Sequence, residues 1–278
     1  MSSTPTPPFE SFITEDGSPT MGLAPTWEPM HARDGAFTET LYIYQPTAER
    51  ALQHVDQPEF LSLGLGLGYN EMLIVFECLK MKREPAKIHS YEKMDFLIEN
   101  FSAWIRGEDA PLSEIYNQIL ALYSDKYRIP AENARVLLKK LLVDGRLLLN
   151  GPFTEATPVP PCHGVFFDAF SSKTSPDLWT PAFLQNFFSH TASICFISTY
   201  ACTGELKRTL RANGFTLAIQ KGFGKKRHST FASKGLLDTF ASKGLVDAFA
   251  GEGSLDSFAR EAVKSFDTIT SDDPSETL

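Results

Sequence analysis

The chain alternates between two patterns of apolar and polar positions. One is a short apolar run, and the other is a longer segment with apolar residues at helical spacing. The apolar runs predict strands over residues 60–63, 88–92, 146–150, 164–167, 194–200 and 215–220. The other segments predict helices over residues 71–80, in pieces across 93–142, from 175 onward and over 203–213. This alternation predicts an α/β fold, in which a mostly parallel sheet carries helices on both faces.

The first 45 residues follow a different pattern. Residues 1–30 are rich in Pro, Ser and Thr, and Asp16-Gly17-Ser18 predicts a turn between two short extended pieces. The run from Gly35 to Tyr44 is expected to end as a strand, because its last residues alternate. On position alone, Glu39 in this run is most simply a solvent-facing strand carboxylate. We therefore expect an N-terminal extension of short strands, residues 1–45, packed on a core domain over 46–234.

A nine-residue repeat begins near the end of the chain, with its phenylalanines at Phe231, Phe240, Phe249 and Phe258. On one straight helix a step of nine residues turns by about 900°, which places successive phenylalanines on opposite faces. The repeat therefore cannot form a single apolar stripe. We expect short helical turns or a mobile tail outside the catalytic core, with residues 235–278 as a separate C-terminal segment.

Composition limits the function without fixing it. The 278 residues carry 26 Lys and Arg against 34 Asp and Glu, a net charge of −8, so any RNA contact requires a local basic patch. The four cysteines form no C-x-x-C pair and the six histidines show no ligand spacing, so we predict no metal site. No signal peptide or apolar run of membrane-spanning length is present, and a cytoplasmic protein with no membrane contact is expected.

A glycine-rich turn joins the first predicted core strand to the first core helix. Gly64, Gly66 and Gly68 form G-x-G-x-G, whereas the dinucleotide fingerprint would require glycine where Tyr69 stands. Such a turn lets the backbone approach a ligand closely and directs helix N–H groups toward it. The spacing suits a nucleoside ligand without a pyrophosphate, such as S-adenosylmethionine. A purely structural turn remains the alternative.

Two carboxylates stand at the ends of predicted strands. Glu92 ends the strand that follows the glycine turn, 24 residues beyond Gly68, where an acidic residue typically binds the ribose hydroxyls. Asp168 ends the strand over 164–167. Because ligands of open α/β sheets bind beyond the carboxyl ends of the strands, we expect both to face the crevice that contains Gly66. The alternatives are a first-turn acid of the next helix for Glu92 and a turn cap for Asp168.

Several motifs occur in a fixed order between roughly residues 14 and 230. They are Gly35–Thr40, Gly64–Asn70, Phe167–Ser171, Pro176–Trp179, Thr199-Tyr200 leading into Arg208–Gly214, and Lys221–Arg227. In this order they resemble the S-adenosylmethionine-dependent methyltransferase domain of the MnmC family of tRNA wobble-uridine enzymes, in its stand-alone form. The pairing of D-A-F-S with K-G-F-G-K-K-R carries this resemblance more specifically than the glycine turn does.

The resemblance implies a class I methyltransferase fold, with a Rossmann-like, seven-stranded, mostly parallel sheet. It implies S-adenosylmethionine as cofactor and methylation of the aminomethyl nitrogen at C5 of the wobble uridine of tRNA, without a flavin domain in this chain. The cofactor-binding residues that it implies are Glu39, Gly64, Gly66, Gly68, Asn70, Glu92 and Asp168. Asp168 is also the expected catalytic residue, since its carboxylate can hydrogen-bond the amine and accept or relay a proton.

Substrate contacts are expected from aromatic and basic side chains. Phe170 and Trp179 are candidates to line a pocket for a flipped-out uracil, with a plain core role as the alternative. The candidates for tRNA phosphate contacts are Lys207, Arg208, Arg211, Lys221, Lys225, Lys226 and Arg227. A solvated charged surface is the alternative for these.

Two positions depart from the family pattern. Ser62 stands where the family carries an acidic residue two before the first glycine, and Asn150-Gly151-Pro152 replaces a segment that supplies an acid near the adenine. These departures leave two other functions open. One is a class I methyltransferase that acts on a small-molecule amine, and the other is a non-catalytic module that binds S-adenosylmethionine or RNA.

Overall fold

The computed structural model describes residues 9–24, 27, 29–169, 175–224 and 228–235. Phe170, Lys225, Lys226 and Arg227 lie outside the described residues, as does the tail from residue 236 onward. In the described ranges, no helix combines the length and apolar character that a bilayer crossing requires.

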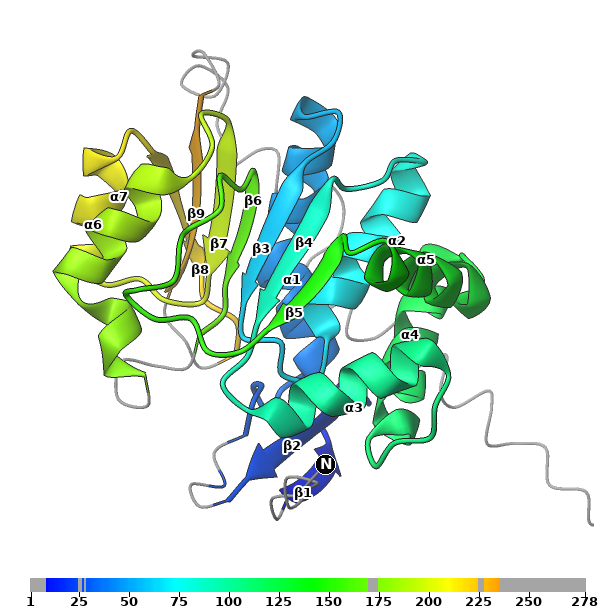
Figure 1. Cartoon of the computed structure of the whole chain (residues 1–278). Helices are drawn as coiled ribbons and strands as arrows, with labels where there is room; N and C mark the ends of the chain where they lie inside the picture. Colours follow the sequence, from blue (N-terminus) through cyan, green and yellow to red (C-terminus); the bar gives the residue numbers. More distant parts are fainter. Residues whose placement is uncertain (1–8, 25–26, 28, 170–174, 225–227, 236–278) are drawn as a thin grey trace, which may run out of the picture.

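A seven-stranded sheet forms the centre of the molecule, in the order β5-β4-β3-β6-β7-β9-β8 (Figure 1). Its strands are β3 (Glu59–Leu63), β4 (Lys87–Tyr91), β5 (Leu147–Asn150), β6 (Gly164–Phe167), β7 (Cys195–Thr199), β8 (Thr216–Lys221) and β9 (His228–Lys234). All neighbours pair in parallel except β9, which runs antiparallel to both β7 and β8. This is the expected α/β architecture, including the seven strands and the final antiparallel hairpin.

Helices cover both faces of this sheet (Figure 1). They are α1 (Ala36–His54), α2 (Tyr69–Met81), α3 (Asp95–Arg106), α4 (Ser113–Tyr127), α5 (Ala131–Val143), the 3₁₀ turn η1 (Pro176–Trp179), α6 (Pro181–His190) and α7 (Gly204–Ala212). Alternating side chains serve the two cores, since Phe60 and Phe166 pack with α1 to α5. Leu61 and Phe167, their neighbours in sequence, pack with α6 and α7.

The segment from Gly35 to Tyr44 is the start of a helix, and the expected strand is wrong. Helix α1 runs for 19 residues, and its buried positions recur every three or four residues, as in Ala36, Thr40 and Tyr44. The alternation that suggested a strand is too short to distinguish a period of two from one of 3.6. Glu39 is therefore a buried helical residue, 6 % exposed, and not a solvent-facing strand carboxylate. The boundary expected at residue 45 lies inside α1.

The two expected N-terminal strands are present as β1 (Phe9–Ile13) and β2 (Pro19–Leu23), an antiparallel hairpin that is separate from the large sheet. The predicted turn at Asp16–Ser18 joins them. Figure 1 shows this hairpin beyond one end of the central strands, close to the start of α3. Hydrogen bonds from the Tyr69 hydroxyl of α2 and from the first backbone N–H groups of α1 connect this hairpin to the two helices.

The start of the first copy of the nine-residue repeat, as far as the structure describes it, forms a strand. Phe231 to Lys234 belong to β9, and Phe231 is only 5 % exposed in the core beside Phe196. The expectation of helical turns outside the core is wrong for this copy, because hydrogen bonding to β7 and β8 decides its conformation. The later copies lie outside the described residues.

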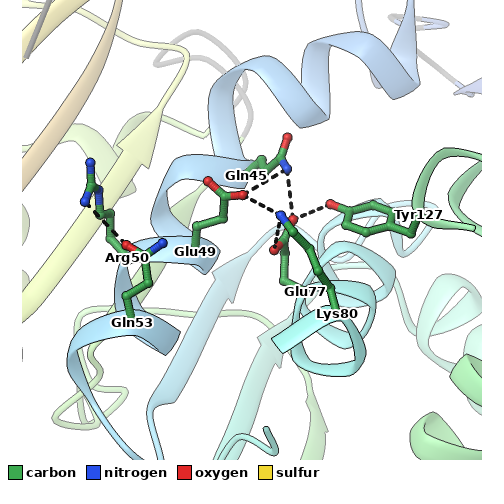
Figure 2. A network of polar contacts seen from close by, with 7 residues as sticks. All are labelled: Gln45, Glu49, Arg50, Gln53, Glu77, Lys80 and Tyr127. Carbon is green, nitrogen blue, oxygen red and sulfur yellow. Dashed lines mark hydrogen bonds and ion pairs between the residues drawn. The ribbon is translucent and has the colours of Figure 1, made fainter. Parts of the chain in front are cut away.

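A network of polar side chains connects the helices α1, α2 and α4 (Figure 2). The buried carboxylate of Glu77 accepts hydrogen bonds from Gln45 Nε2 at 2.9 Å and from the Tyr127 hydroxyl at 2.5 Å. Lys80 Nζ lies 3.2 Å from Glu77 and 2.7 Å from Glu49. A buried carboxylate with a cation and two donors is compensated, so this network joins the three helices.

Candidate active site

A cavity of about 380 Å³ lies at the carboxyl ends of the central strands. Its lining comes from the residues that follow β3, β4 and β6, from the first turns of α1 and α2, and from the segment Pro29–Arg33. Of the predicted cofactor residues, six line the cavity, namely Glu39, Gly64, Gly66, Asn70, Glu92 and Asp168. The sheet thus brings together the glycine turn and both strand-end carboxylates, while Gly68 lies outside the lining.

Each glycine of the turn has a positive φ, at 101° for Gly64, 51° for Gly66 and 74° for Gly68. Packing explains why two of these positions require glycine. A Cβ on Gly64 would lie 2.9 Å from the Asp168 carbonyl oxygen, and one on Gly68 would lie 2.4 Å from the Phe101 ring. At Gly66 the nearest neighbour of such a Cβ would be Met30 Sδ at 3.8 Å, so the backbone there is open toward the cavity.

Glu92 is buried, and backbone groups hold its carboxylate. One oxygen accepts from the Gly66 N–H at 3.0 Å, and the other accepts from the N–H groups of Lys93 at 2.8 Å and Met94 at 3.0 Å. Burial raises its pKa, and these hydrogen bonds act in the opposite direction. Because α3 begins only at Asp95, Glu92 fixes the loop between β4 and the helix and the centre of the glycine turn.

Asp168 joins three elements at the cavity. The Tyr44 hydroxyl from α1 donates to Oδ1 at 2.5 Å, and Asn70 Nδ2 from α2 donates to Oδ2 at 2.9 Å. Burial raises the pKa of Tyr44 well above its usual value, and the Asp168 charge adds to this effect, so the phenol keeps its proton. Two donors that approach different oxygens fix the plane of the carboxylate.

Sequence reasoning missed Tyr44, because the expected strand gave it no reason to face Asp168. On a helix, Tyr44 lies one turn beyond Thr40, and both line the cavity. Correct recognition of the helical period would have placed it on this face.

The segment Pro29–Arg33 covers the cavity and was also missed. The Ala32 N–H donates to Glu39 Oε2 at 2.8 Å. His31 Nδ1 lies 3.0 Å from Thr20 Oγ1, and its ring meets the Tyr69 ring edge-on, with 4.8 Å between centroids. The segment has neither periodicity nor a motif, so nothing in the sequence marked it. It attaches the hairpin strand β2 to the glycine turn and α1.

Trp179 does not line the cavity. Its ring meets Phe167 of the second core at 5.0 Å in a T-shaped contact and lies 6.4 Å from the ring of Tyr200. Tyr200 does line the cavity, and its hydroxyl donates to the Ala169 carbonyl at 2.7 Å. Among the described residues, Tyr200 and not Trp179 is thus the aromatic side chain that this part of the chain contributes to the lining.

The predicted basic residues that the structure describes lie on two elements. Lys207, Arg208 and Arg211 are on α7, where Arg208 pairs with Glu205. Lys221 ends β8, and its carbonyl accepts from the Tyr42 hydroxyl at 2.8 Å. Since β8 and β9 form an antiparallel hairpin beside β7, the loop after Lys221 lies at the same sheet edge as Asp168. Of the described basic residues, Lys221 is the one that the fold places at this edge of the sheet.

A second buried acid lies beneath the glycine turn. Glu71 is fully buried, its Oε1 accepts from the Ser90 hydroxyl at 2.6 Å, and burial raises its pKa to about 7. The hydroxyl of Ser62, on the strand next to Ser90, is buried and lacks a hydrogen bond of ordinary geometry among the described residues. Glu71, in the first turn of α2, thus lies close to the neighbouring strand positions Ser62 and Ser90.

The cavity suits S-adenosylmethionine on two structural observations. Asn70 Oδ1 is a buried acceptor with no partner among the described residues, so a ligand with an N–H or ammonium donor would satisfy it. The open backbone at Gly66 also permits the close approach that a nucleoside requires. Within the described ranges, no group of three His, Cys, Asp or Glu side chains could hold a metal ion.

Comparison with known proteins gives a family model described as "S-adenosyl-L-methionine-dependent methyltransferase", which matches residues 108–235. The bifunctional protein MnmC of Aromatoleum aromaticum, named for tRNA 5-methylaminomethyl-2-thiouridine biosynthesis, is 27 % identical over 235 residues, 80 % of this chain and 35 % of the relative. The MnmC of Paraburkholderia phymatum is 26 % identical over 176 residues, 60 % of this chain and 26 % of the relative. The chain thus spans about a third or less of these curated relatives.

The fold agrees with a solved structure, that of MnmC2 from Aquifex aeolicus, with a TM-score of 0.59 at 21 % identity, over 84 % of this chain and 71 % of that one. The chain resembles the MnmC methyltransferase family. The MnmC-like chain has the class I methyltransferase fold, and S-adenosylmethionine is its cofactor. The chain is thus similar to methyltransferases that depend on S-adenosylmethionine, MnmC among them.

Proposed function

We propose that the protein N-methylates the 5-aminomethyl group of the tRNA wobble uridine, giving 5-methylaminomethyl-(2-thio)uridine. The observation that carries the proposal is the Asp168 carboxylate, held by Tyr44 and Asn70 at the wall of the cavity. An amine substrate needs an acceptor that orients its nitrogen, and this carboxylate is fixed in one plane for that purpose.

On the cofactor side, the sulfonium centre supplies the methyl group when the cofactor is bound. Glu92 would accept hydrogen bonds from the ribose hydroxyls, since its position is fixed by the backbone of the glycine turn. The backbone from Gly64 to Gly68 would lie against the nucleoside. Glu39 and Asp168, both at the cavity, would face the ammonium group of the methionine part.

On the substrate side, a primary amine is largely protonated at neutral pH and has to lose a proton before its nitrogen can attack. Asp168 would hydrogen-bond the amine, align it for in-line displacement, and hold or pass on that proton. A new N–C bond forms as the S–C bond breaks. Tyr44 would act through Asp168, by keeping its carboxylate oriented, and Asn70 would do the same while its Oδ1 accepts from the ligand.

The tRNA would approach along the edge where β8 ends. Lys221 and the basic residues that follow it would contact phosphates, and the α7 face with Lys207 and Arg211 would extend the contact. Phe170 remains a candidate for stacking on the uracil, and so does Trp179, whose ring lies 6.4 Å from that of the cavity residue Tyr200.

The test is methyl transfer from labelled cofactor to bulk tRNA that lacks the modification, with nucleoside analysis of the product. We expect label in 5-methylaminomethyl-uridine nucleosides and none in tRNA that is already modified. Cofactor binding is measured in parallel by calorimetry. A preparation that binds the cofactor but leaves the wobble uridine unmethylated would refute the proposed substrate.

A methyltransferase for a small cationic amine is the second candidate. Three carboxylates, Glu39, Glu92 and Asp168, line the cavity, and such a lining attracts a cation more readily than a polyanion. Salt dependence separates the two candidates, because phosphate contacts make tRNA methylation fall steeply between 50 and about 200 mM salt. Efficient methylation of a free polyamine, with little salt dependence and no turnover of tRNA, would favour the second candidate.

A further inference from the structure

Helix α1 begins without a capping side chain of its own, because its N-cap residue is Gly35. The first N–H groups of a helix have no partner within the helix, so their acceptors have to come from outside it. Here they come from the turn between β1 and β2. Ser18 Oγ accepts from the N–H groups of Ala36 at 3.1 Å and Phe37 at 3.0 Å.

Asp16 completes this remote cap. Its Oδ2 accepts from the Thr38 N–H at 2.9 Å and from the Thr38 hydroxyl at 2.8 Å. Its Oδ1 accepts from the Thr14 hydroxyl at 2.6 Å and from the Ser18 N–H at 3.0 Å, so one carboxylate organises both the turn and the helix. A negative charge at this end also interacts favourably with the helix dipole.

The absence of a side chain at Gly35 allows this approach. A Cβ there would lie 2.4 Å from Asp16 Oδ2 and 2.3 Å from Thr38 Oγ1, closer than atoms can pack. The hairpin turn and the start of α1 are therefore complementary in shape. The contact is specific to this pair of segments.

The capped helix start leads directly to the cavity. Glu39 and Thr40 line it from the first turns of α1, and Tyr44, about one turn further on, donates to Asp168. The same hairpin also reaches the opposite wall, because the Tyr69 hydroxyl at the start of α2 donates to the Pro19 carbonyl at 2.7 Å. Two helices that line the cavity, α1 and α2, are thus hydrogen-bonded to the same hairpin.

We propose that Asp16 is a positioning residue for the site, which sets the first turns of α1 against the glycine turn and thereby places Glu39 and Tyr44. It touches neither cofactor nor substrate and acts through the helix. The inference rests on the proposed function only in taking the cavity as the cofactor site, whatever the methyl acceptor is.

The test compares Asp16→Ala with Asp16→Asn and with Glu15→Ala, a matched control at an exposed neighbouring acid of the same turn. Removal of a cap side chain weakens a helix start substantially, so we expect Asp16→Ala to lower cofactor affinity and kcat by about tenfold each. Asp16→Asn keeps one acceptor oxygen and should recover most of this loss. Glu15→Ala should stay within about twofold of the wild type. All are measured well below the unfolding midpoint, with circular dichroism as the check on folding.

A double-mutant cycle separates positioning from general weakening. If Asp16 acts through Tyr44, the kcat of the double variant Asp16→Ala/Tyr44→Phe should lie within about twofold of that of Tyr44→Phe alone. Additive losses, or a folded Asp16→Ala protein with wild-type affinity and kcat, would overturn the inference. The affinity measurement needs no tRNA, so a wild type that binds cofactor but methylates no tRNA would refute the proposed function and leave this test decisive.

Discussion

Two carboxylates of this protein, the buried Glu77 and the half-buried Asp168, share two kinds of hydrogen-bond donor and differ in what lies beyond them. Glu77 accepts from a tyrosine hydroxyl at 2.5 Å and a side-chain amide at 2.9 Å, and so does Asp168. Glu77 also has a lysine at 3.2 Å (Figure 2), and it lies between packed helices. Asp168 lies instead at the wall of a cavity of about 380 Å³.

The comparison teaches that the hydrogen bonds alone do not mark a functional acid. A Tyr–amide pair around a carboxylate satisfies it equally well in a structural network and in a site. What distinguishes Asp168 is its place at the carboxyl edge of the sheet, where it lines a cavity that a ligand can enter.

The largest effect should follow from Asp168→Asn. The amide keeps the shape but loses the charge that orients an amine and takes part in proton removal, so kcat/KM should fall by about 10³-fold. The matched variant Glu77→Gln, with the same chemical change in the structural network, should keep kcat/KM within about twofold of the wild type. Steady-state methyl transfer measures both, and equal losses in the two variants would erase the distinction.

The next effect concerns Glu71, which accepts a hydrogen bond from the Ser90 hydroxyl and does not line the cavity. Its folded pKa of about 7 is raised above the unfolded value by burial, so the native state binds the proton more tightly. The stability from this group is present at low pH and is lost as the pH rises toward 7. The free energy of unfolding of the wild type, relative to Glu71→Gln, should therefore fall by about 2 to 3 kcal/mol between roughly pH 5 and 8. Urea unfolding at several pH values tests this, and parallel curves for the two proteins would contradict it.

A smaller effect is expected for Glu77→Ala. The change leaves Tyr127, Gln45 and Lys80 without their common acceptor, although Lys80 can turn to solvent because it is 44 % exposed. We expect the free energy of unfolding to fall by about 2 kcal/mol. At temperatures where the variant is folded, kcat should not change. A large loss of activity in the folded variant would connect this network to the site after all.

The fold could be predicted because its signals are local. Alternating strand and helix patterns and the G-x-G-x-G turn gave the α/β sheet, and the general rule on strand ends placed Glu92 and Asp168 together. The rule works because the carboxyl ends of parallel strands meet at one edge, whatever the loops do.

The rest of the site depends on contacts that the sequence does not show. Tyr44 was hidden by a run of only a few alternating residues, which is shorter than either period needs for recognition. The segment Pro29–Arg33 has no period, and its place follows from single bonds such as that of Ala32 to Glu39. The capping of α1 by Asp16 joins segments through side chains on a separate hairpin, and no local pattern predicts such a pairing.

The strand β9 has an unusual relation to the sequence that follows it. Residues 239–243 repeat Thr230–Lys234 letter for letter, so the loss of residues 230–238 would rejoin His228-Ser229 to an identical continuation. β7 and β8 would then pair with the same side chains of β9 as they do now. A chain with one repeat unit fewer would therefore have the same β9 sequence in the sheet, and the difference in length would fall in the residues after it.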